Sequence, residues 1–278
     1  MSDALVSVLT ALADDELVLG HRHSEWTGFA PHIEEDVAFS SIAQDEIGHA
    51  GAYYSLLAEI QGVDADSLAL GRGKSMYRHA ILCERSNGDW AYTLARHWLY
   101  DHADEIRLES LEDSSHPGLV SLARKIRREE RYHLLHADAW ITRVAHGPIE
   151  GRRKLVDVVA GAFVEASGLF EPFELEDPAV KEGILPVPSP ELQQRFETKM
   201  IKAFDELGFP TEAPAHAEDR AEFVASSSGD LIAGEGNGER TAPVQAGLGG
   251  RRGHHTEEFD GLWDDMTITY RNNPGATW

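Results

Sequence analysis

Two pairs of residues, each a glutamate followed three positions later by a histidine, are well suited to bind metal. The first pair is Glu46 and His49, and the second is Glu130 and His133. Three residues make nearly one helical turn, so each pair presents a carboxylate and an imidazole on one helix face. Helix-bundle di-iron proteins use such Glu-x-x-His pairs inside the bundle. The two copies therefore predict a buried metal centre.

Apolar residues surround both pairs at alternating spacings of three and four, the period of an amphipathic helix. The first pair is surrounded by Phe39, Ile42, Tyr53, Leu56 and Ile60. The second is surrounded by Leu119, Ala123, Ile126, Ala137, Trp140 and Val144. The pattern predicts helices over residues 34–62 and 117–146. One pair alone would also fit a surface glutamate and histidine that fall in register, whereas two copies favour a shared site.

A di-iron bundle also needs one carboxylate from each of two further helices. In the helix predicted over residues 3–26, Glu16 is the one acid on the apolar face. In a third predicted helix, which ends before residue 114, Asp101 and Glu105 share such a face. Each of the two helices therefore offers at least one candidate ligand.

The spacing between these candidates favours Asp101. Asp101 precedes Glu130 by 29 residues, and Glu16 precedes Glu46 by 30. Such near-equal spacing indicates an internal repeat in which each half is a helical hairpin. The predicted metal ligands are Glu16, Glu46, His49, Asp101, Glu130 and His133.

These elements predict an all-α fold built on a four-helix bundle. Additional C-terminal helices are expected over residues 152–170 and 190–207, and a last one follows Thr256. Residues 210–250 are rich in Ala, Glu, Gly, Ser and Pro, a composition typical of flexible chain. We expect three parts: a helical domain over residues 1–209, an acidic flexible insert over 210–250, and a C-terminal helix within 251–278 that packs on the domain.

The turn before the last helix is basic and rich in glycine. It contains Gly249, Gly250, Arg251, Arg252 and Gly253. Backbone N–H groups in such turns can cradle a phosphate, so this turn fits the phosphate of a bulky cofactor or thioester. A flexible basic turn is the simpler alternative.

Composition narrows the function further. The formal charge of −23, from 48 acids and 25 bases, argues against a nucleic-acid partner. The sequence shows neither a membrane span nor a signal peptide, so we expect a cytoplasmic protein. The single Cys83 cannot build an iron–sulfur cluster, and electrons would come from a separate reductase. Six other histidines are interpreted as surface residues or neighbours of the ligands: His21, His23, His32, His97, His102 and His136.

Four blocks of sequence carry a family resemblance. They are ALADDELVLGHRHSEWTGFAPHIEEDVAFSSIAQDEIGHA, NGDWAYTLARHWLYD, EERYHLLHADAW and GGRRGHHTEEFDGLW…NNPGATW. Together they resemble the PaaC-type subunits of the multicomponent phenylacetyl-CoA epoxidase, across nearly the whole chain outside the acidic stretch. The resemblance implies a ferritin-like fold and a place in the O₂-dependent monooxygenase of phenylacetate catabolism, an oxidoreductase complex that acts on phenylacetyl-CoA.

The resemblance also implies partners and cofactors. In that complex a related subunit, PaaA, holds the working di-iron centre, and a separate reductase supplies electrons from NADPH. The PaaC-type subunit is the structural companion of PaaA and has lost metal ligands. We predict the same structural role for this chain. Apolar residues beyond the needs of a four-helix core support a partner surface: Trp90, Phe163, Phe170, Phe173 and Trp263.

This sequence differs from a PaaC-type subunit that has lost its metal ligands, because all six predicted ligands are present. Asp101 is one methylene shorter than the expected glutamate, so either its helix moves inward or Glu105 replaces it. Glu129 competes with Glu130 for the inward direction. Two alternatives to a structural role follow: a subunit with its own carboxylate-bridged di-iron (Fe) site that acts as an oxygenase or oxidase, and a ferritin-like metal-binding protein.

Overall fold

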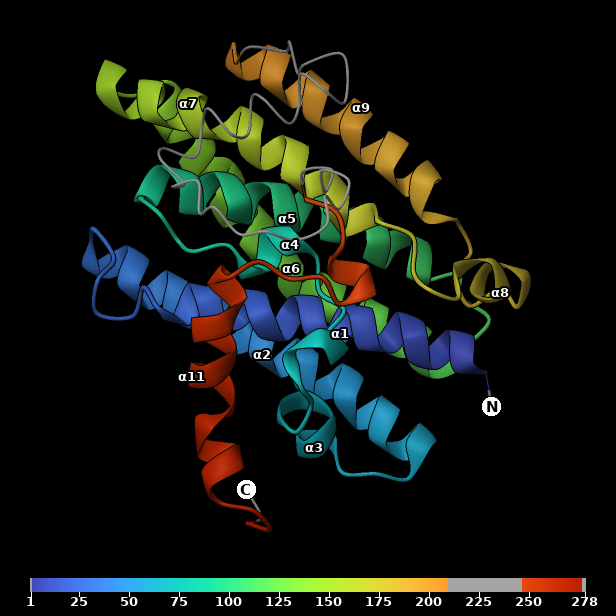
Figure 1. The fold of residues 1–278 in the computed structure, drawn as a ribbon. Helices are drawn as coiled ribbons and strands as arrows, with labels where there is room; N and C mark the ends of the chain where they lie inside the picture. Colours follow the sequence, from blue (N-terminus) through green and yellow to red (C-terminus); the bar gives the residue numbers. More distant parts are fainter. Residues whose placement is uncertain (1, 210–246, 277–278) are drawn as a thin grey trace, which may run out of the picture.

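The computed structural model describes residues 2–209 and 247–276, and all regular structure within these ranges is helical. Figure 1 shows the arrangement. The α-helices are α1 (Asp3–Ser24), α2 (Ile33–Gln61), α3 (Ala65–Leu70), α4 (Ile81–Glu84), α5 (Trp90–Leu111), α6 (Pro117–Ala145), α7 (Ile149–Ala166), α8 (Glu176–Lys181), α9 (Ser189–Leu207) and α11 (Glu258–Asn272). Short 3₁₀ helices are η1 (Lys74–Met76), η2 (Ser167–Phe170) and η3 (Gly250–Arg252). The predicted all-α, ferritin-like class is confirmed.

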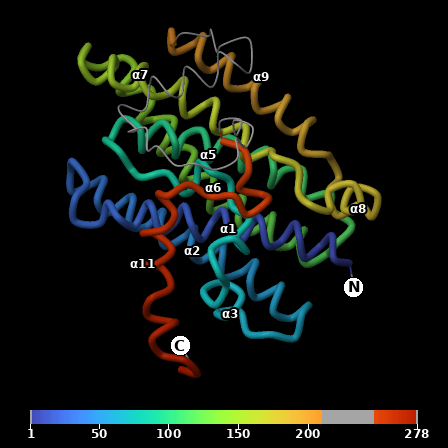
Figure 2. The backbone as a smooth tube through the Cα atoms, in the orientation of Figure 1, coloured from blue at the N-terminus to red at the C-terminus, as the bar shows by residue number. Residues whose placement is uncertain are grey.

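The four long helices that carry the predicted ligands form two antiparallel hairpins, α1 with α2 and α5 with α6 (Figures 1 and 2). Local signals set their ends. Gly62 ends α2 at a positive φ of 69°, which glycine adopts without steric cost. The Asp89 side chain caps α5 by accepting from the Tyr92 N–H at 3.1 Å. Pro117 begins α6, where its missing N–H costs nothing.

The region between the hairpins contains short helices that the sequence did not predict. Residues 63–88 lack a clear period, yet they fold into α3, η1 and α4. Each is at most six residues long, so its sequence is too short to show a helical period. Tertiary contacts to α1 and α2 stabilise these pieces.

Helices α7 and α9 cover the outer face of α5 with an aromatic layer. The Phe163 ring lies 5.1 Å from that of Phe204 and 5.8 Å from that of Phe196, between centroids. Phe163, Phe170 and Phe173 are therefore buried within this chain. Trp90 and Trp263 are half-buried and pack against the same core. The inference of a partner surface is wrong for Phe163, Phe170 and Phe173, because this chain's own helices cover them. Trp90 and Trp263 keep part of their surface exposed, so for these two it stays a prediction.

The glycine-rich turn is tightly anchored. Arg251 is 1 % exposed, and its guanidinium donates to both carboxylate oxygens of Asp15 on α1, at 2.8 and 2.7 Å. A β-carbon on Gly250 would lie 2.1 Å from the His79 carbonyl oxygen, so only glycine fits there. Both interpretations drawn from its sequence, the phosphate cradle and the flexible turn, are wrong for this segment, because its central arginine is used inside the protein.

The C-terminal helix α11 packs near α1, α3 and α4 through Phe259, Leu262 and Met266 (Figure 1). The acidic insert expected over residues 210–250 lies outside the described residues, apart from residues 247–250. In the part of the chain that the structure describes, we find no helix long and apolar enough to cross a membrane.

Candidate metal centre

Helices α1, α2, α5 and α6 bring all six predicted ligands together in the middle of the bundle. Each is at most 4 % exposed: Glu16 on α1, Glu46 and His49 on α2, Asp101 on α5, and Glu130 and His133 on α6. Burying four carboxylic acids is costly unless they are protonated, paired or bound to cations. The structure therefore brings four buried acids into one place, where a bound metal ion would reduce the repulsion between their charges.

The nitrogens of the two Glu-x-x-His histidines point at the carboxylates. His49 Nδ1 lies 3.4 Å from Glu16 Oε2 and 3.2 Å from Glu130 Oε1. His133 Nδ1 lies 3.1 Å from the same Glu130 oxygen. None of these atoms makes a well-oriented hydrogen bond to the described residues. Two ligands held at about 2.1 Å from one transition metal lie about 3.0–3.4 Å apart, so the arrangement fits a shared ion.

The opposite nitrogens of these histidines are held by a reciprocal pair of acids. His49 Nε2 lies 3.0 Å from Glu129 Oε2, and His133 Nε2 lies 3.2 Å from Asp45 Oδ2. Each acid immediately precedes the glutamate of the opposite motif. Such outer carboxylates fix the ring orientation of metal-binding histidines. The repeated acidic dipeptide before each x-x-His was the available signal, but the sequence analysis missed Asp45.

The two choices that the sequence left open have clear positions in the structure. Asp101 is 2 % exposed and faces the cluster, whereas Glu105 is partly exposed and pairs with Lys199. Glu130 points inward, and the side chain of Glu129 is 42 % exposed. The inward residues are therefore Asp101 and Glu130, and Glu129 supports His49 from outside.

Burial and mutual contacts shift the pKa values of the cluster residues. Burial raises the pKa of Glu46 and of Asp101 well above their usual ranges. Burial opposes protonation of His49 and His133, but contacts with Glu130 and other acids raise their pKa values to about 11 and about 10. In the absence of metal, protons therefore reduce the repulsion among the buried acids. Bound divalent ions would take over that task, with release of protons.

A cavity of about 380 Å³ between α5 and α6 reaches two of the six residues, Asp101 and Glu130. Its other walls are mostly charged: Glu105, Glu112, Arg124, Arg127, Arg128, Arg131 and Leu134. It provides a polar path from the surface of the helix pair to the buried acids.

The fold and this buried cluster define a helical-bundle protein with a carboxylate and histidine centre. A family model described as "Phenylacetic acid catabolic protein" (PaaA_PaaC) matches residues 1–226, so the chain belongs to that family. It is also similar to the C component of the 1,2-phenylacetyl-CoA epoxidase of Escherichia coli (strain K12), with 28 % identity over 277 residues and 99 % of each chain covered. The predicted family is confirmed.

Proposed function

We propose that this chain is the PaaC-type component of a phenylacetyl-CoA epoxidase, and that it acts in the cytoplasm as the structural partner of a PaaA-like catalytic subunit. The proposal rests on the end-to-end similarity to the C component of such an epoxidase. The complex would use O₂, with electrons from NADPH delivered by a separate reductase. This chain contributes the rigid bundle on which the catalytic subunit is held.

An exposed apolar surface on α2 and α6 supports a docking role. Ile33 and Val37 on α2 are 75 % and 63 % exposed, and Leu135 on α6 is 57 % exposed. His136 Nε2 lies 2.9 Å from Glu35 Oε2, which places these parts of α2 and α6 side by side. Exposed apolar patches of this kind mark protein–protein contacts. We infer that the PaaA-like subunit binds this face.

The docking face is tested by Leu135→Asp, with Ile201→Asp on α9 as the matched control because Ile201 is 48 % exposed on a different face. Both place the same charge on a helix surface. We expect Leu135→Asp to weaken binding of the PaaA-like subunit at least about tenfold, about 1.4 kcal/mol, in a titration by calorimetry. Equal affinities for both variants and the unchanged protein would refute this docking face.

A second candidate function has its own support. The six converging residues have buried ligand atoms without hydrogen-bond partners in the described chain, which favours a di-iron centre held by this subunit. Bound there, two irons would supply the O₂-derived oxidant that ring epoxidation needs. Glu129 would orient His49, and Asp45 would orient His133.

The double variant Glu46→Ala/His49→Gln separates the two candidates in a reconstituted complex. With a structural role, turnover of phenylacetyl-CoA stays nearly intact, because the working irons are in the partner. With an active centre here, turnover falls by more than about 100-fold, about 2.7 kcal/mol in the barrier. Assembly is checked by size-exclusion chromatography. The control, Glu191→Ala/Arg195→Gln, removes an exposed ion pair on α9.

A further inference from the structure

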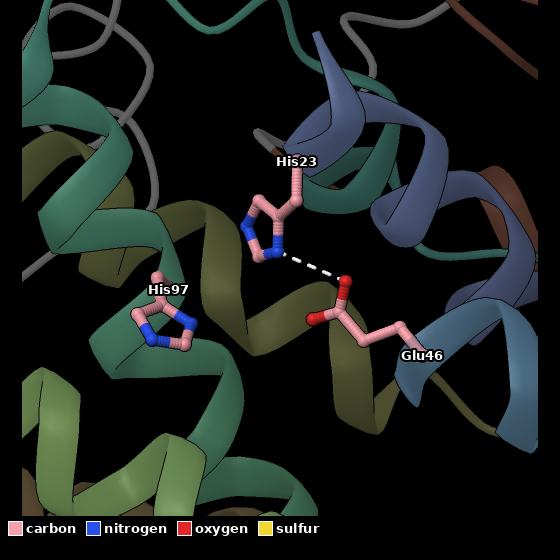
Figure 3. A group of neighbouring side chains, drawn as sticks. All are labelled: His23, Glu46 and His97. Carbon is pink, nitrogen blue, oxygen red and sulfur yellow. Dashed lines mark hydrogen bonds and ion pairs between the residues drawn. The ribbon is translucent and has the colours of Figure 1, made fainter. Parts of the chain in front are cut away.

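Two buried histidines outside the six-residue cluster flank Glu46. His23 comes from α1 and His97 from α5, and both are fully buried. His23 Nδ1 lies 2.9 Å from Glu46 Oε2, and one ligand atom from each of the three residues lies within 4.8 Å of the others. Figure 3 shows the His97 ring facing the space beside His23 and Glu46. We propose that His23, Glu46 and His97 bind one divalent first-row transition metal ion.

Unused hydrogen-bonding atoms give this group its binding capacity. Glu46 Oε1, His23 Nε2 and both ring nitrogens of His97 are buried without a hydrogen-bond partner in the described parts of the chain. A buried polar atom without a hydrogen-bond partner destabilises the fold. A metal ion would use several of them at once. The sequence left two interpretations of His23 and His97, a surface position or a position next to the ligands. The surface position is wrong, because both residues are buried. Their position beside Glu46 allows them to bind a metal ion together with it.

The surroundings of this group are apolar. The Phe39 ring lies 5.2 Å from the His23 ring and 5.3 Å from the His97 ring and excludes water. Both histidine rings are fully buried. Histidine binds metal through a neutral imidazole nitrogen.

The ligand set defines the class of ion. Two imidazoles and one carboxylate match the set that holds non-haem Fe²⁺ with open positions, and they also suit Co²⁺ and Zn²⁺. Ca²⁺ and Mg²⁺ prefer shells made of oxygen and are poor candidates. Asp101 Oδ1 lies 3.3 Å from His97 Nδ1, so the new position adjoins the six-residue cluster. The ion would therefore lie beside the six predicted ligands and would be additional to any two metal ions that they bind.

This inference stands apart from the epoxidase role and from the six-residue centre, although the two sites share Glu46. His23 and His97 are not among the six, whereas His49 and His133 belong only to that set. Changing one pair of histidines therefore leaves the other site's imidazoles in place. The two sites can fail separately, and a metal titration distinguishes the failures.

The test is anaerobic titration of the full chain with Co²⁺, followed by visible absorption of the bound ion. We expect His97→Gln, alone or with His23→Gln, to bind one equivalent fewer than the unchanged protein, or to bind it at least about 100-fold more weakly. His102→Gln is the matched control, because His102 is also a buried histidine of α5 but contacts Asp138 instead. It should keep the full stoichiometry and spectrum.

A second variant keeps the proposal testable if His97→Gln fails to fold. In His49→Gln/His133→Gln, the six-residue centre loses both imidazoles, and X-ray absorption should still show imidazole bound to one Co²⁺. Bound Co²⁺ with oxygen ligands alone in that variant overturns the proposal. Unchanged stoichiometry and spectrum in folded His97→Gln overturn it as well, as does a full chain that binds no Co²⁺. A loss in His49→Gln/His133→Gln that spares the His97-dependent equivalent supports it.

Discussion

Two groups of identical composition, each a glutamate with two histidines, lie inside this protein and use their atoms differently. In the first, Glu84 Oε2 lies 2.7 Å from His79 Nε2 and 2.8 Å from His255 Nδ1. The Thr256 backbone N–H donates to Glu84 Oε1 at 2.6 Å. The two imidazole rings stack with centroids 4.2 Å apart. Both carboxylate oxygens are thus engaged, and the group fastens the C-terminal segment to α4.

The second group, His23, Glu46 and His97, is fully buried but leaves most of its polar atoms unused. Here Glu46 Oε2 contacts His23, and no described backbone donor reaches the other oxygen. The comparison teaches that residue types and burial do not distinguish a structural anchor from a metal site. The distinguishing quantity is the hydrogen-bonding capacity that the protein itself leaves unsatisfied.

The largest expected effect comes from a second contact that fastens the C-terminal segment, the ion pair between Arg251 and Asp15. Arg251→Met removes both hydrogen bonds of this ion pair and leaves the buried carboxylate with fewer donors. We expect a loss of about 3–5 kcal/mol in the free energy of unfolding, as for other broken buried ion pairs. Urea unfolding measures it. Arg252→Met, one residue on and exposed, is the control, and an equal loss in both variants would contradict the anchor.

A matched pair of glutamine substitutions compares the two glutamates directly in the presence of a chelator. Glu84 accepts three hydrogen bonds through its two oxygens. In Glu84→Gln one of the two positions becomes an NH₂ donor that faces donors, so we expect a loss of about 2–3 kcal/mol. Glu46→Gln should change stability by less than about 0.5 kcal/mol or increase it, because burial raises the pKa of Glu46 and already favours the neutral carboxyl. Similar losses of unfolding free energy in Glu84→Gln and Glu46→Gln would contradict the proposed difference between the two groups.

The pH dependence of the Glu84 effect provides an internal check. Burial opposes ionisation, but hydrogen bonds from His255 and His79 lower the pKa of Glu84 from 4.5 to about 2. Because the folded value is the lower one, this stabilisation is full above about pH 4.5 and is lost as the pH falls toward 2. The difference between the unchanged protein and Glu84→Gln should shrink over that window in urea unfolding.

The last prediction concerns metal affinity at the six-residue centre. The raised pKa values of His49, about 11, and His133, about 10, mean that a metal must displace their protons at neutral pH. The apparent affinity for Co²⁺ should therefore rise with pH, about tenfold per unit for each displaced proton, between about pH 6 and 8. Competition against a chelator measures it. A flat profile would contradict binding that displaces protons from His49 and His133.

Local periodicity predicted the long helices and the inward direction of their ligands well. Glu46, His49, Glu130 and His133 repeat on helix faces whose apolar neighbours mark the core, so their burial could be predicted from sequence. The predicted metal-binding role of all six residues stays a prediction. Asp101 was favoured by repeat spacing, and its inward direction agrees with that choice.

Long-range pairing could not be predicted. Glu84 and His255 lie 171 residues apart, and no local pattern relates a residue of α4 to one beyond the acidic stretch. The glycines around Arg251 suggested mobility, whereas their missing side chains allow close backbone contact. His23 lies on the predicted apolar face of α1, but a lone histidine on such a face does not reveal which other helices will meet it.

The ion pair between Asp15 and Arg251 also bears on how the chain is made. Its two halves are 236 residues apart, so α1 leaves the ribosome long before its arginine exists. Until then, the Asp15 carboxylate has to stay hydrated or rely on Arg107, which donates to it at 2.7 Å. A nascent chain folds in order from its N-terminus, and here the first helix cannot reach its final buried state until residue 251 has been synthesised. The burial of Asp15 is therefore one of the later steps in the folding of this chain.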